Sequence, residues 1–549
     1  MIRRDLVWLT VLALVVRLVT AAFIRQPGYM DTAYYAAEAA HLAEGGGLTE
    51  PFLWNYLDDP VGLPHPGFLY WMPLPSFLAV PFVALFPGSF FAAQLPFVLL
   101  SALLPPVAYL VAWQTPGPKA GLGARRRAWA ACLLTLFSGF FFPYWTLPET
   151  FAPFALFGSL ALWIAGGGKP DADGRMRKLC RWLLVGLLAG LCHLTRADGI
   201  VLLSVVALAP LLGLWARIRV KIEQDGVSGQ AQGNAPTRLI ASTIGGLALI
   251  VAGYLLVMGP WFLRNLRQVG SLLSPAGTKA MWLTTYDDLF CYDCDLSLRS
   301  YMAWGVGNVL RSKLFALWTN LQRFLAEDCL VFLLPLVLIG LYRLRTCLRF
   351  ALSTIYLLCL YLVHSLVFTY PGWRGGFFHS SGVLLPYLYA AGIVGLDVAV
   401  RWVARRRRRW HVRQAGTVYA AGAVVLAVFL SLYVTFTKLP AWWDADQVYG
   451  DVSAWLSQRG VASDTAIMVG NPPAFWYRSR RPSVVVPNGG VDTLLAVADR
   501  YGVGYVILDV NRPVPLADLH AGQASHPRLQ LAATWMDRET VLYAVRQER

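Results

Sequence analysis

A single carboxylate follows the first long apolar segment of the chain. Residues 6–24 are almost all hydrophobic, and Asp31 comes shortly after them, ahead of Tyr34 and Tyr35. An acid this close to a membrane segment adds little to solubility, whereas a carboxylate at a membrane surface can accept the proton of an attacking hydroxyl or amine. Asp31 is therefore the first candidate for a catalytic base. The alternative interpretation is a cap for the helix predicted from residue 32 onward.

Glu149 is a second isolated acid. It is the only charged residue between Arg127 and Lys169, and it follows a Leu-Pro pair at the end of an apolar stretch. A carboxylate in such a place can bind a metal ion, hold an acceptor or orient a basic side chain. The other interpretation is a solvated helix start, which the helix dipole favours.

Asp58, Asp59 and His65 form a third polar group. Adjacent carboxylates offer the oxygen ligands that divalent metals take. Their spacing matches no metal-site pattern, however, and solvated turn residues before Pro60 are the simpler interpretation. The sequence therefore assigns no metal ligand and no certain cofactor, and it leaves a divalent metal open.

The elements that must position these residues are membrane helices. Of the 549 residues, 57% are hydrophobic and 14% charged, and apolar stretches of spanning length recur along most of the chain. This pattern predicts an all-α polytopic membrane protein. The net charge of +16 does not indicate nucleic acid, because 25 of the 47 Lys and Arg residues fall in six short connections between apolar stretches, as the positive-inside rule describes.

These basic connections orient the chain. They are Arg3 and Arg4, Lys119 with residues 125–127, and residues 169–181, 217–238, 343–349 and 401–413. Placing all six in the cytoplasm predicts about eleven transmembrane helices. The predicted spans are 6–24, 90–113, 128–145, 151–166, 181–194, 199–216, 239–259, 328–345, 350–369, 381–402 and 416–436. An odd number of crossings leaves the N-terminus in the cytoplasm and the C-terminus outside.

Arg17 interrupts the first of these spans. A charged residue at mid-membrane costs about 2.5 to 3.5 kcal/mol on insertion scales, so we expect Arg17 to face other helices and to find a partner there. Because the apolar run around it is long, we interpret the segment as a retained anchor and not as a cleaved signal peptide.

Two predicted outer loops are large. Residues 25–89 contain a polar helical stretch, a triple glycine at 45–47 and a proline-punctuated apolar stretch at 65–87, which we interpret as a helix along the outer interface. Residues 264–327 are rich in Trp, Tyr and Arg and include an amphipathic stretch at 301–325. Cys291 and Cys294 lie in this second loop, where they can form a disulfide in an oxidising compartment.

The composition changes after the last predicted span. Residues 439–549 contain no spanning segment, and short β-branched runs alternate with helical patterns. Strands are predicted at 465–469, 483–487, 504–509, 529–535 and 540–545, with helices at 446–459 and 492–501. The chain is thus divided into a membrane domain, residues 1–438, and an extracytoplasmic α/β domain, residues 439–549.

Several segments of the membrane domain resemble the GT-C superfamily of glycosyltransferases, most closely its protein O-mannosyltransferase and lipid A aminoarabinose transferase branch (families 39 and 83). The similar segments are residues 31–45, 65–71 (His-Pro-Gly-Phe-Leu-Tyr-Trp, with glycine where the family has a second proline), 190–199 and 260–265. The resemblance covers roughly residues 1–436 and rests on the order of these segments.

This resemblance implies an enzyme that moves a sugar from a polyprenyl-phosphate donor to an extracytoplasmic acceptor, with a carboxylate of the first outer loop as the base. That residue is Asp31 here. It also implies a role for the acid of the second outer loop, Glu149, although many family members have aspartate there. An anionic leaving group needs cations or hydrogen-bond donors; the substrate-binding candidates are Arg264, Arg374, His379, Lys279, His65 and Tyr35. For Arg264 and Arg374 the alternative is contact with lipid headgroups.

Arg196 and Asp198 are predicted on the same side of the membrane, where they can simply pair. Two other functions remain open. A transporter or lipid flippase would place ionisable groups near mid-membrane, whereas these acids gather at one face. A non-catalytic envelope assembly protein would leave Asp31 without a chemical task. We therefore predict a membrane glycosyltransferase of the plasma (inner) membrane whose partners are the lipid-linked donor, the acceptor and the bilayer.

Overall fold

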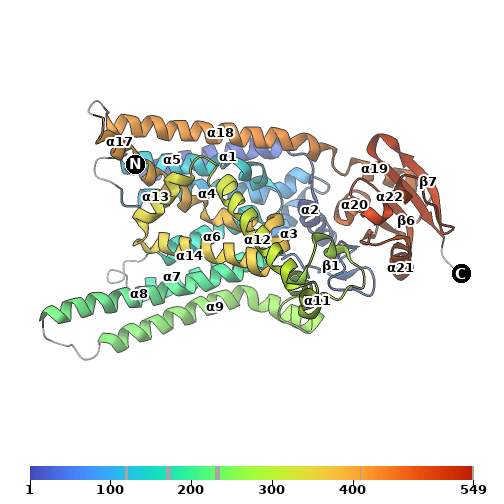
Figure 1. The fold of residues 1–549 in the computed structure, drawn as a ribbon, viewed down its shortest axis with the longest axis horizontal. Helices are drawn as coiled ribbons and strands as arrows, with labels where there is room; N and C mark the ends of the chain where they lie inside the picture. Colours follow the sequence, from blue (N-terminus) through green and yellow to red (C-terminus); the bar gives the residue numbers. More distant parts are fainter. Residues whose placement is uncertain (118–120, 168–174, 229–234, 408–409, 547–549) are drawn as a thin grey trace.

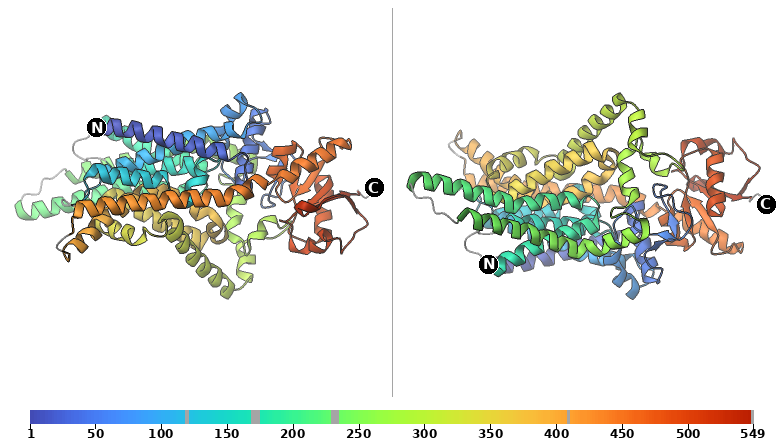
Figure 2. Two further views of the ribbon diagram at one scale, coloured as in Figure 1. Left: turned by 90° about the horizontal axis from the view of Figure 1, so that it is seen from above. Right: turned by 90° about the horizontal axis from the view of Figure 1, so that it is seen from below.

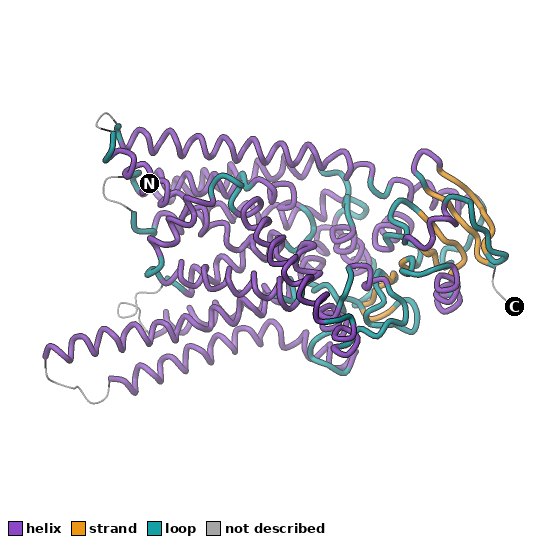
Figure 3. Tube along the Cα trace, viewed as in Figure 1, coloured by secondary structure: helices purple, strands orange, loops and turns teal. Residues whose placement is uncertain are grey.

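The computed structural model describes residues 1–117, 121–167, 175–228, 235–407 and 410–546. Lys119, Lys169, Arg408 and Arg409, which contribute to the predicted cytoplasmic basic connections, lie outside the described residues. The molecule is elongated, with a helical bundle at one end and a mixed α/β domain at the other (Figure 1). Strands occur almost only in and beside that second domain (Figure 3).

The bundle is built from apolar helices, most of them long. Their bounds are α1 (Ile2–Phe23), α4 (Phe90–Trp113), α5 (Ala124–Leu136), α6 (Phe151–Ala165), α7 (Arg175–Thr195), α8 (Gly199–Ser228), α9 (Ala235–Val269), α13 (Leu334–Leu344), α14 (Leu348–Leu362), α16 (Phe377–Ser381), α17 (Leu385–Ala404) and α18 (Val412–Asp444). A continuous apolar core joins most of them. The protein is a polytopic helical membrane protein, as the composition predicts.

Among the described residues, seven helices are long and apolar enough to cross a membrane, and the bent pair formed by α5 and the 3₁₀ helix η1 (Gly139–Thr146) makes an eighth. These eight correspond to eight of the predicted spans. The other three predicted spans match α6, the apolar part of α8 and α13, which are shorter apolar helices. Each predicted span thus has a helix, while the count of eleven crossings remains a prediction.

Arg17 is fully buried in α1, and its partners are not acids. Its Nη2 donates to the carbonyl oxygen of Leu136 at 3.0 Å, and its guanidinium lies over the rings of Phe142 and Trp145. Leu136 is the last residue of α5, where the chain bends by 65° into η1. Arg17 therefore satisfies a carbonyl that this break frees, and it helps to fix the segment that leads to Glu149.

The first outer loop folds into α2 (Met30–Ala43), three two-residue strands and α3 (Leu74–Leu85); the strands are β1 (Thr49–Glu50), β2 (Phe52–Leu53) and β3 (His65–Pro66). The second contains α10 (Pro275–Lys279), α11 (Leu298–Ala303), α12 (Val306–Arg323), and the short turns η2 (Ala280–Trp282) and η3 (Tyr286–Phe290). Helix α12 falls within the predicted amphipathic stretch. Cys291 and Cys294 form a disulfide in this loop.

Three π-helical turns and short helices complete this end of the bundle. They are η4 (Phe324–Asp328), η5 (Val363–Val367), α15 (Thr369–Pro371), η6 (Gly372–Gly376) and η7 (Gly382–Leu384).

The C-terminal domain is built on one mixed sheet with the strand order β2-β5-β4-β6-β8-β7. Its own strands are β4 (Ala466–Val469), β5 (Ser483–Val485), β6 (Val503–Leu508), β7 (Leu529–Trp535) and β8 (Thr540–Val545), all at the predicted positions. Its helices are α19 (Gln447–Gln458), α20 (Pro472–Ser479), α21 (Val491–Tyr501) and α22 (Ala517–His520), with turns η8 (Val514–Leu516) and η9 (Met536–Arg538).

The edge strand β2 comes from the first outer loop, more than 400 residues away in sequence. Phe52 and Leu53 pair in parallel with Ser483 and Val484 of β5. The loop that carries Asp31 and the C-terminal domain therefore share one sheet, and the α/β domain lies against this end of the bundle in both views of Figure 2. Helix α18 continues past residues 438–439, where the sequence predicts the domain boundary, to Asp444. That boundary remains a prediction.

Candidate active site

Asp31, Glu149 and His379 come together although they are far apart in sequence. Their ligand-type atoms all lie within 4.8 Å of one another. Nδ1 of His379 is 3.0 Å from Oε1 of Glu149, and Nε2 is 4.0 Å from Oδ2 of Asp31. The imidazole therefore stands between the two carboxylates. Of the residues that sequence analysis named, these three form the tightest group.

Asp31 lies in the first turn of α2, and the end of α18 fixes that turn. Gly28 has a φ of +79°, and a Cβ there would lie 2.6 Å from the Trp442 side chain. The Gln26 amide donates to the carbonyl oxygens of Trp442, Trp443 and Ala445. The N-cap of α2 is Tyr29, so Asp31 is not the cap residue.

Glu149 lies deeper than Asp31. Its side chain is 1% exposed, against 33% for Asp31. The Tyr29 hydroxyl donates to Oε2 of Glu149 at 3.1 Å. Burial raises the pKa of Glu149 to about 8, although the charge of Arg196 and the Tyr29 hydrogen bond favour the ionised form. Glu149 is thus a buried, held carboxyl, and the interpretation as a solvated helix start does not hold.

Asp31 can reach an incoming molecule and can hold a proton near neutral pH. Burial raises its pKa to about 6; the charge of Glu149 adds to this effect, and His379 and Arg196 oppose it. A general base works best when its pKa lies near the working pH. The position and the pKa of Asp31 therefore both suit proton abstraction.

The ring of His379 is held on two sides. It stacks on Phe151 with ring centroids 4.1 Å apart and an interplanar angle of 18°. The Thr150 hydroxyl lies 3.0 Å from Nδ1. Because Thr150 and Phe151 begin α6, the same segment positions Glu149 and the imidazole that it contacts.

Arg196 and Asp198 form a partly buried ion pair beside this group. Nε of Arg196 is 3.2 Å from Oδ1 of Asp198, and Nη1 is 3.4 Å from the Thr150 hydroxyl. Ser380 donates to Oδ2 of Asp198, and Nε2 of His364 is 2.8 Å from the same oxygen. Burial raises the pKa of Asp198, but Arg196 and the hydrogen bonds prevail and hold the pKa below its usual range.

His364 fits into this network because two glycines let the chain approach it. A Cβ on Gly372 would lie 1.9 Å from the His364 carbonyl oxygen, and one on Gly376 would lie 2.8 Å from its imidazole. Asn320 of α12 donates to the same carbonyl at 3.3 Å and to the Ser365 hydroxyl at 3.0 Å. The glycines at residues 372–376 thus serve packing around His364.

Tyr35 is fully buried near this group, and Arg374 contacts Tyr286. The Arg374 guanidinium lies 4.2 Å from the ring centroid of Tyr286. Burial raises the pKa of Tyr286, and the charge of Asp31 adds to the shift. The Tyr35 hydroxyl is buried without a hydrogen-bond partner among the described residues, and burial, the charge of Glu149 and that of Asp31 all raise its pKa. Tyr35 therefore has a free donor within the electrostatic reach of both acids.

Of three other candidates, His65 lies in the first outer loop, and Arg264 of α9 and Lys279 of α10 contact this loop. Arg264 donates to the carbonyl oxygens of Leu48 and Gly67, and Lys279 donates to that of Leu57. His65 lies between Glu50 and Asp58, at 3.6 Å and 3.7 Å. These contacts brace the loop, and a role in substrate binding remains a prediction for all three.

The pair Asp58 and Asp59 does not act as one unit. Asp58 faces His65, whereas Oδ1 of Asp59 is 2.8 Å from Nη1 of Arg500 in α21. Asp59 thus ties the first outer loop to the C-terminal domain.

Asp31, Glu149 and His379 offer two carboxylate oxygens and one imidazole nitrogen, a donor set that suits a divalent cation. Within the described part of the chain, this is the one group of three or more acidic, histidine or cysteine residues with that spacing. The ligand atoms of the three residues are thus close enough to one another to share one metal ion.

Known structures share this arrangement of elements. ArnT from Cupriavidus metallidurans, in a crystal structure with undecaprenyl phosphate, aligns over 98% of this chain and 97% of its own with a TM-score of 0.53 and 16% identity; its apo structure gives the same values. The Archaeoglobus fulgidus oligosaccharyltransferase, in a crystal structure with Zn and sulfate, aligns over 93% of this chain and 69% of its own, with a TM-score of 0.51 and 12% identity. The chain therefore shares the overall fold of these two proteins. No family model and no curated protein sequence matches it.

Within this fold, sequence analysis missed the roles of Tyr29, Thr150, His364 and Ser380. Tyr29 lies two residues before Asp31, and Thr150 directly follows Glu149, which is a signal that could have pointed to them. His364 and Ser380 have no such signal. They reach Asp198 only because the π-helical turns around residues 363–376 fold back on the α7–α8 connection.

Proposed function

We propose that the protein is a membrane glycosyltransferase. It transfers a sugar from a polyprenyl-phosphate donor to an extracytoplasmic acceptor, with Asp31 as the general base. One observation carries the proposal: a partly exposed carboxylate stands beside a buried carboxyl and an imidazole, at the end of the bundle where the α/β domain lies. The likeness to ArnT, whose structure holds undecaprenyl phosphate, supports a lipid-linked donor.

The residues divide the task as follows. Asp31 takes the proton of the acceptor hydroxyl or amine as its oxygen or nitrogen attacks the anomeric carbon, and the bond from that carbon to the phosphate oxygen breaks. Attack from the face opposite the leaving group inverts the anomeric configuration. The departing phosphate is an anion. Arg196, whose charge acts on both Asp31 and Glu149, is the cation placed to stabilise it, and Arg374, which lies against Tyr286, is a second candidate.

A divalent ion held by Glu149 and His379 beside Asp31 would neutralise the charge that develops on the phosphate and would leave Asp31 to act as the base. The Zn in the A. fulgidus structure supports such a site. The buried Glu149 and the stacked ring of His379 would hold the ion, while Tyr29 and Thr150 orient these two ligands through their hydrogen bonds.

We also propose that the membrane is the plasma (inner) membrane, with the N-terminus in the cytoplasm and the acids outside. The geometry does not favour the transporter and assembly-protein alternatives. Asp31 and Glu149 lie in one group with His379, and that group is at one end of the bundle.

Mass spectrometry of envelope glycans and glycolipids tests the proposal. Cells that lack the protein should lose one sugar modification, and wild-type protein should restore it. Asp31→Asn should fail to restore it at normal protein level. Asp295→Asn is the matched control, because Asp295 is an exposed acid of the second outer loop whose carboxylate contacts only Ser297 among the described contacts. Full restoration by Asp31→Asn would refute the role of the base.

A further inference from the structure

A long stretch at the other end of the bundle carries positive charge without any acid. Between Asp397 and Asp444 the sequence has seven arginines and one lysine and no Asp or Glu. Asp397 itself is engaged by Arg127 at 3.7 Å. Among the described residues, Arg405, Arg406, Arg407 and Arg413 form no ion pair. This end of α17 and α18 therefore presents uncompensated cations.

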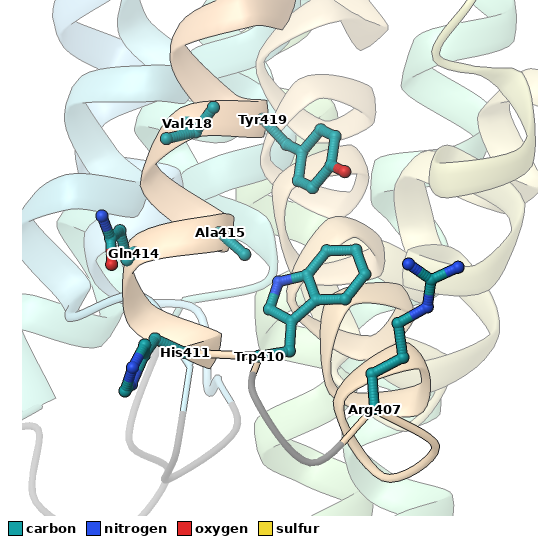
Figure 4. A pocket seen from close by; sticks show the side chains of 7 residues that line it. All are labelled: Arg407, Trp410, His411, Gln414, Ala415, Val418 and Tyr419. Atoms are coloured by element: carbon teal, nitrogen blue, oxygen red, sulfur yellow. The ribbon is translucent and has the colours of Figure 1, made fainter.

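A surface hollow of about 470 Å³ lies beside these cations, where α18 begins. Figure 4 shows Trp410 and Tyr419 on one side of the hollow, with the Arg407 guanidinium next to them. The other lining residues are His411, Gln414, Ala415 and Val418. Arg407 lies over the Trp410 ring at 5.8 Å, and the rings of Trp410 and Tyr419 are 6.2 Å apart.

An apolar track leads away from the hollow along α18. Val418, Val425, Phe429, Tyr433 and Phe436 are all more than half exposed and recur at intervals of three, four or seven residues, which places them on one face. Helix α18 crosses the full length of the bundle at its surface, from the hollow to the α/β domain (Figure 1). This face meets hydrocarbon in a bilayer.

We propose that this hollow binds the headgroup of one anionic phospholipid. Its acyl chain then follows the exposed face of α18, in the leaflet opposite the candidate active site. Charge complementarity selects the anionic headgroup, and the continuous apolar track selects a ligand with an acyl chain. A soluble anion would match the arginine but not the track, and a zwitterionic lipid would match the track but would bring a cation of its own to the arginines.

The side chains around the hollow suit a phosphodiester. The Arg407 guanidinium can donate two parallel hydrogen bonds to two phosphate oxygens. The Trp410 indole and the Tyr419 ring give the flat, amphipathic walls typical of the membrane interface. Gln414 and His411 add donors for the glycerol or headgroup oxygens. Basic pockets between membrane helices recognise anionic headgroups by these same contacts.

Native mass spectrometry of the full chain tests this site. The protein is presented with equal amounts of dioleoyl phosphatidylglycerol and dioleoyl phosphatidylcholine in mild detergent. We expect the wild type to retain one phosphatidylglycerol with a preference of about tenfold, the factor that one charge-assisted contact supplies. Arg407→Gln combined with Trp410→Ala should abolish the preference, and Arg407→Lys should leave an intermediate one because it keeps the charge but loses the fork.

The matched control is Arg345→Gln. Arg345 also lies over an aromatic ring, that of Tyr342, at 4.1 Å, but it does not line the hollow. The Arg345→Gln variant should bind phosphatidylglycerol with the same preference as the wild type. Equal retention of the two lipids by the wild type, or an unchanged preference in the double variant, would overturn the proposal. Displacement of the lipid by millimolar inorganic phosphate would also overturn it, since the hollow would then be a site for a free anion.

Discussion

Nδ1 of His379 lies 3.0 Å from Oε1 of Glu149, although 230 positions separate these residues in the chain. The contact joins the start of α6 to the short helix α16, and the far nitrogen of the same ring faces Asp31 at 4.0 Å. One imidazole therefore connects the buried carboxyl to the accessible one. A substitution at any of the three residues should therefore change the position or the charge state of the other two.

Replacement of Asp31 should remove the base and leave the fold intact. We expect Asp31→Asn to lower the transfer rate by about 10² to 10⁴, the usual contribution of a placed base. Asp31→Glu should recover part of the rate, because it keeps a carboxylate at an altered distance. The rate of sugar transfer by purified protein measures both. An Asn variant within threefold of wild type would contradict this role.

The pH profile should report the raised pKa of Asp31. Burial raises this pKa to about 6, so the carboxylate forms only as the pH rises through that value. Since the base must be ionised, we expect kcat/KM to increase with pH and to be half-maximal near pH 6. A profile that is flat from pH 5 to 8 would show that Asp31 does not limit the reaction.

Glu149→Gln should weaken the binding of a divalent metal ion at this site. Gln keeps the shape of the carboxyl but offers no charge to a cation. If a divalent ion binds here, wild-type activity should fall on chelation, and the variant should need at least about tenfold more metal for recovery. His65→Gln is the control, because His65 lies in a separate cluster with Glu50 and Asp58. An equal effect of both variants would argue against this site.

Gly372→Ala should destabilise the packing around His364. The added methyl group would meet the His364 carbonyl oxygen at 1.9 Å, so backbone must move. We expect a loss of about 1 to 3 kcal/mol, the usual cost of overpacking, seen as a lower thermal unfolding midpoint in detergent. Gly245→Ala in α9 is the matched control, since no atom lies within 4 Å of its Cβ position. It should be neutral or stabilising by about 0.5 to 1 kcal/mol.

The sequence alone determined the class of protein and the position of most helices and strands. Apolar stretches of membrane length predict helices because the bilayer forces the backbone to satisfy its own hydrogen bonds. The strands of the α/β domain follow from β-branched runs. Asp31 and Glu149 stood out because an isolated charge next to an apolar segment is costly unless it has a function.

Only the tertiary structure decided which polar residues meet. The sequence offers His379, Arg264 and His65 as binding candidates on the same grounds. Only His379 contacts Asp31 and Glu149, however, whereas Arg264 and His65 make contacts that brace the first outer loop. Likewise, β2 is too short to be recognised as a strand, and it exists because β5 offers an unpaired edge. Such contacts depend on how segments hundreds of residues apart pack against one another. The local pattern of apolar and polar residues does not predict that packing.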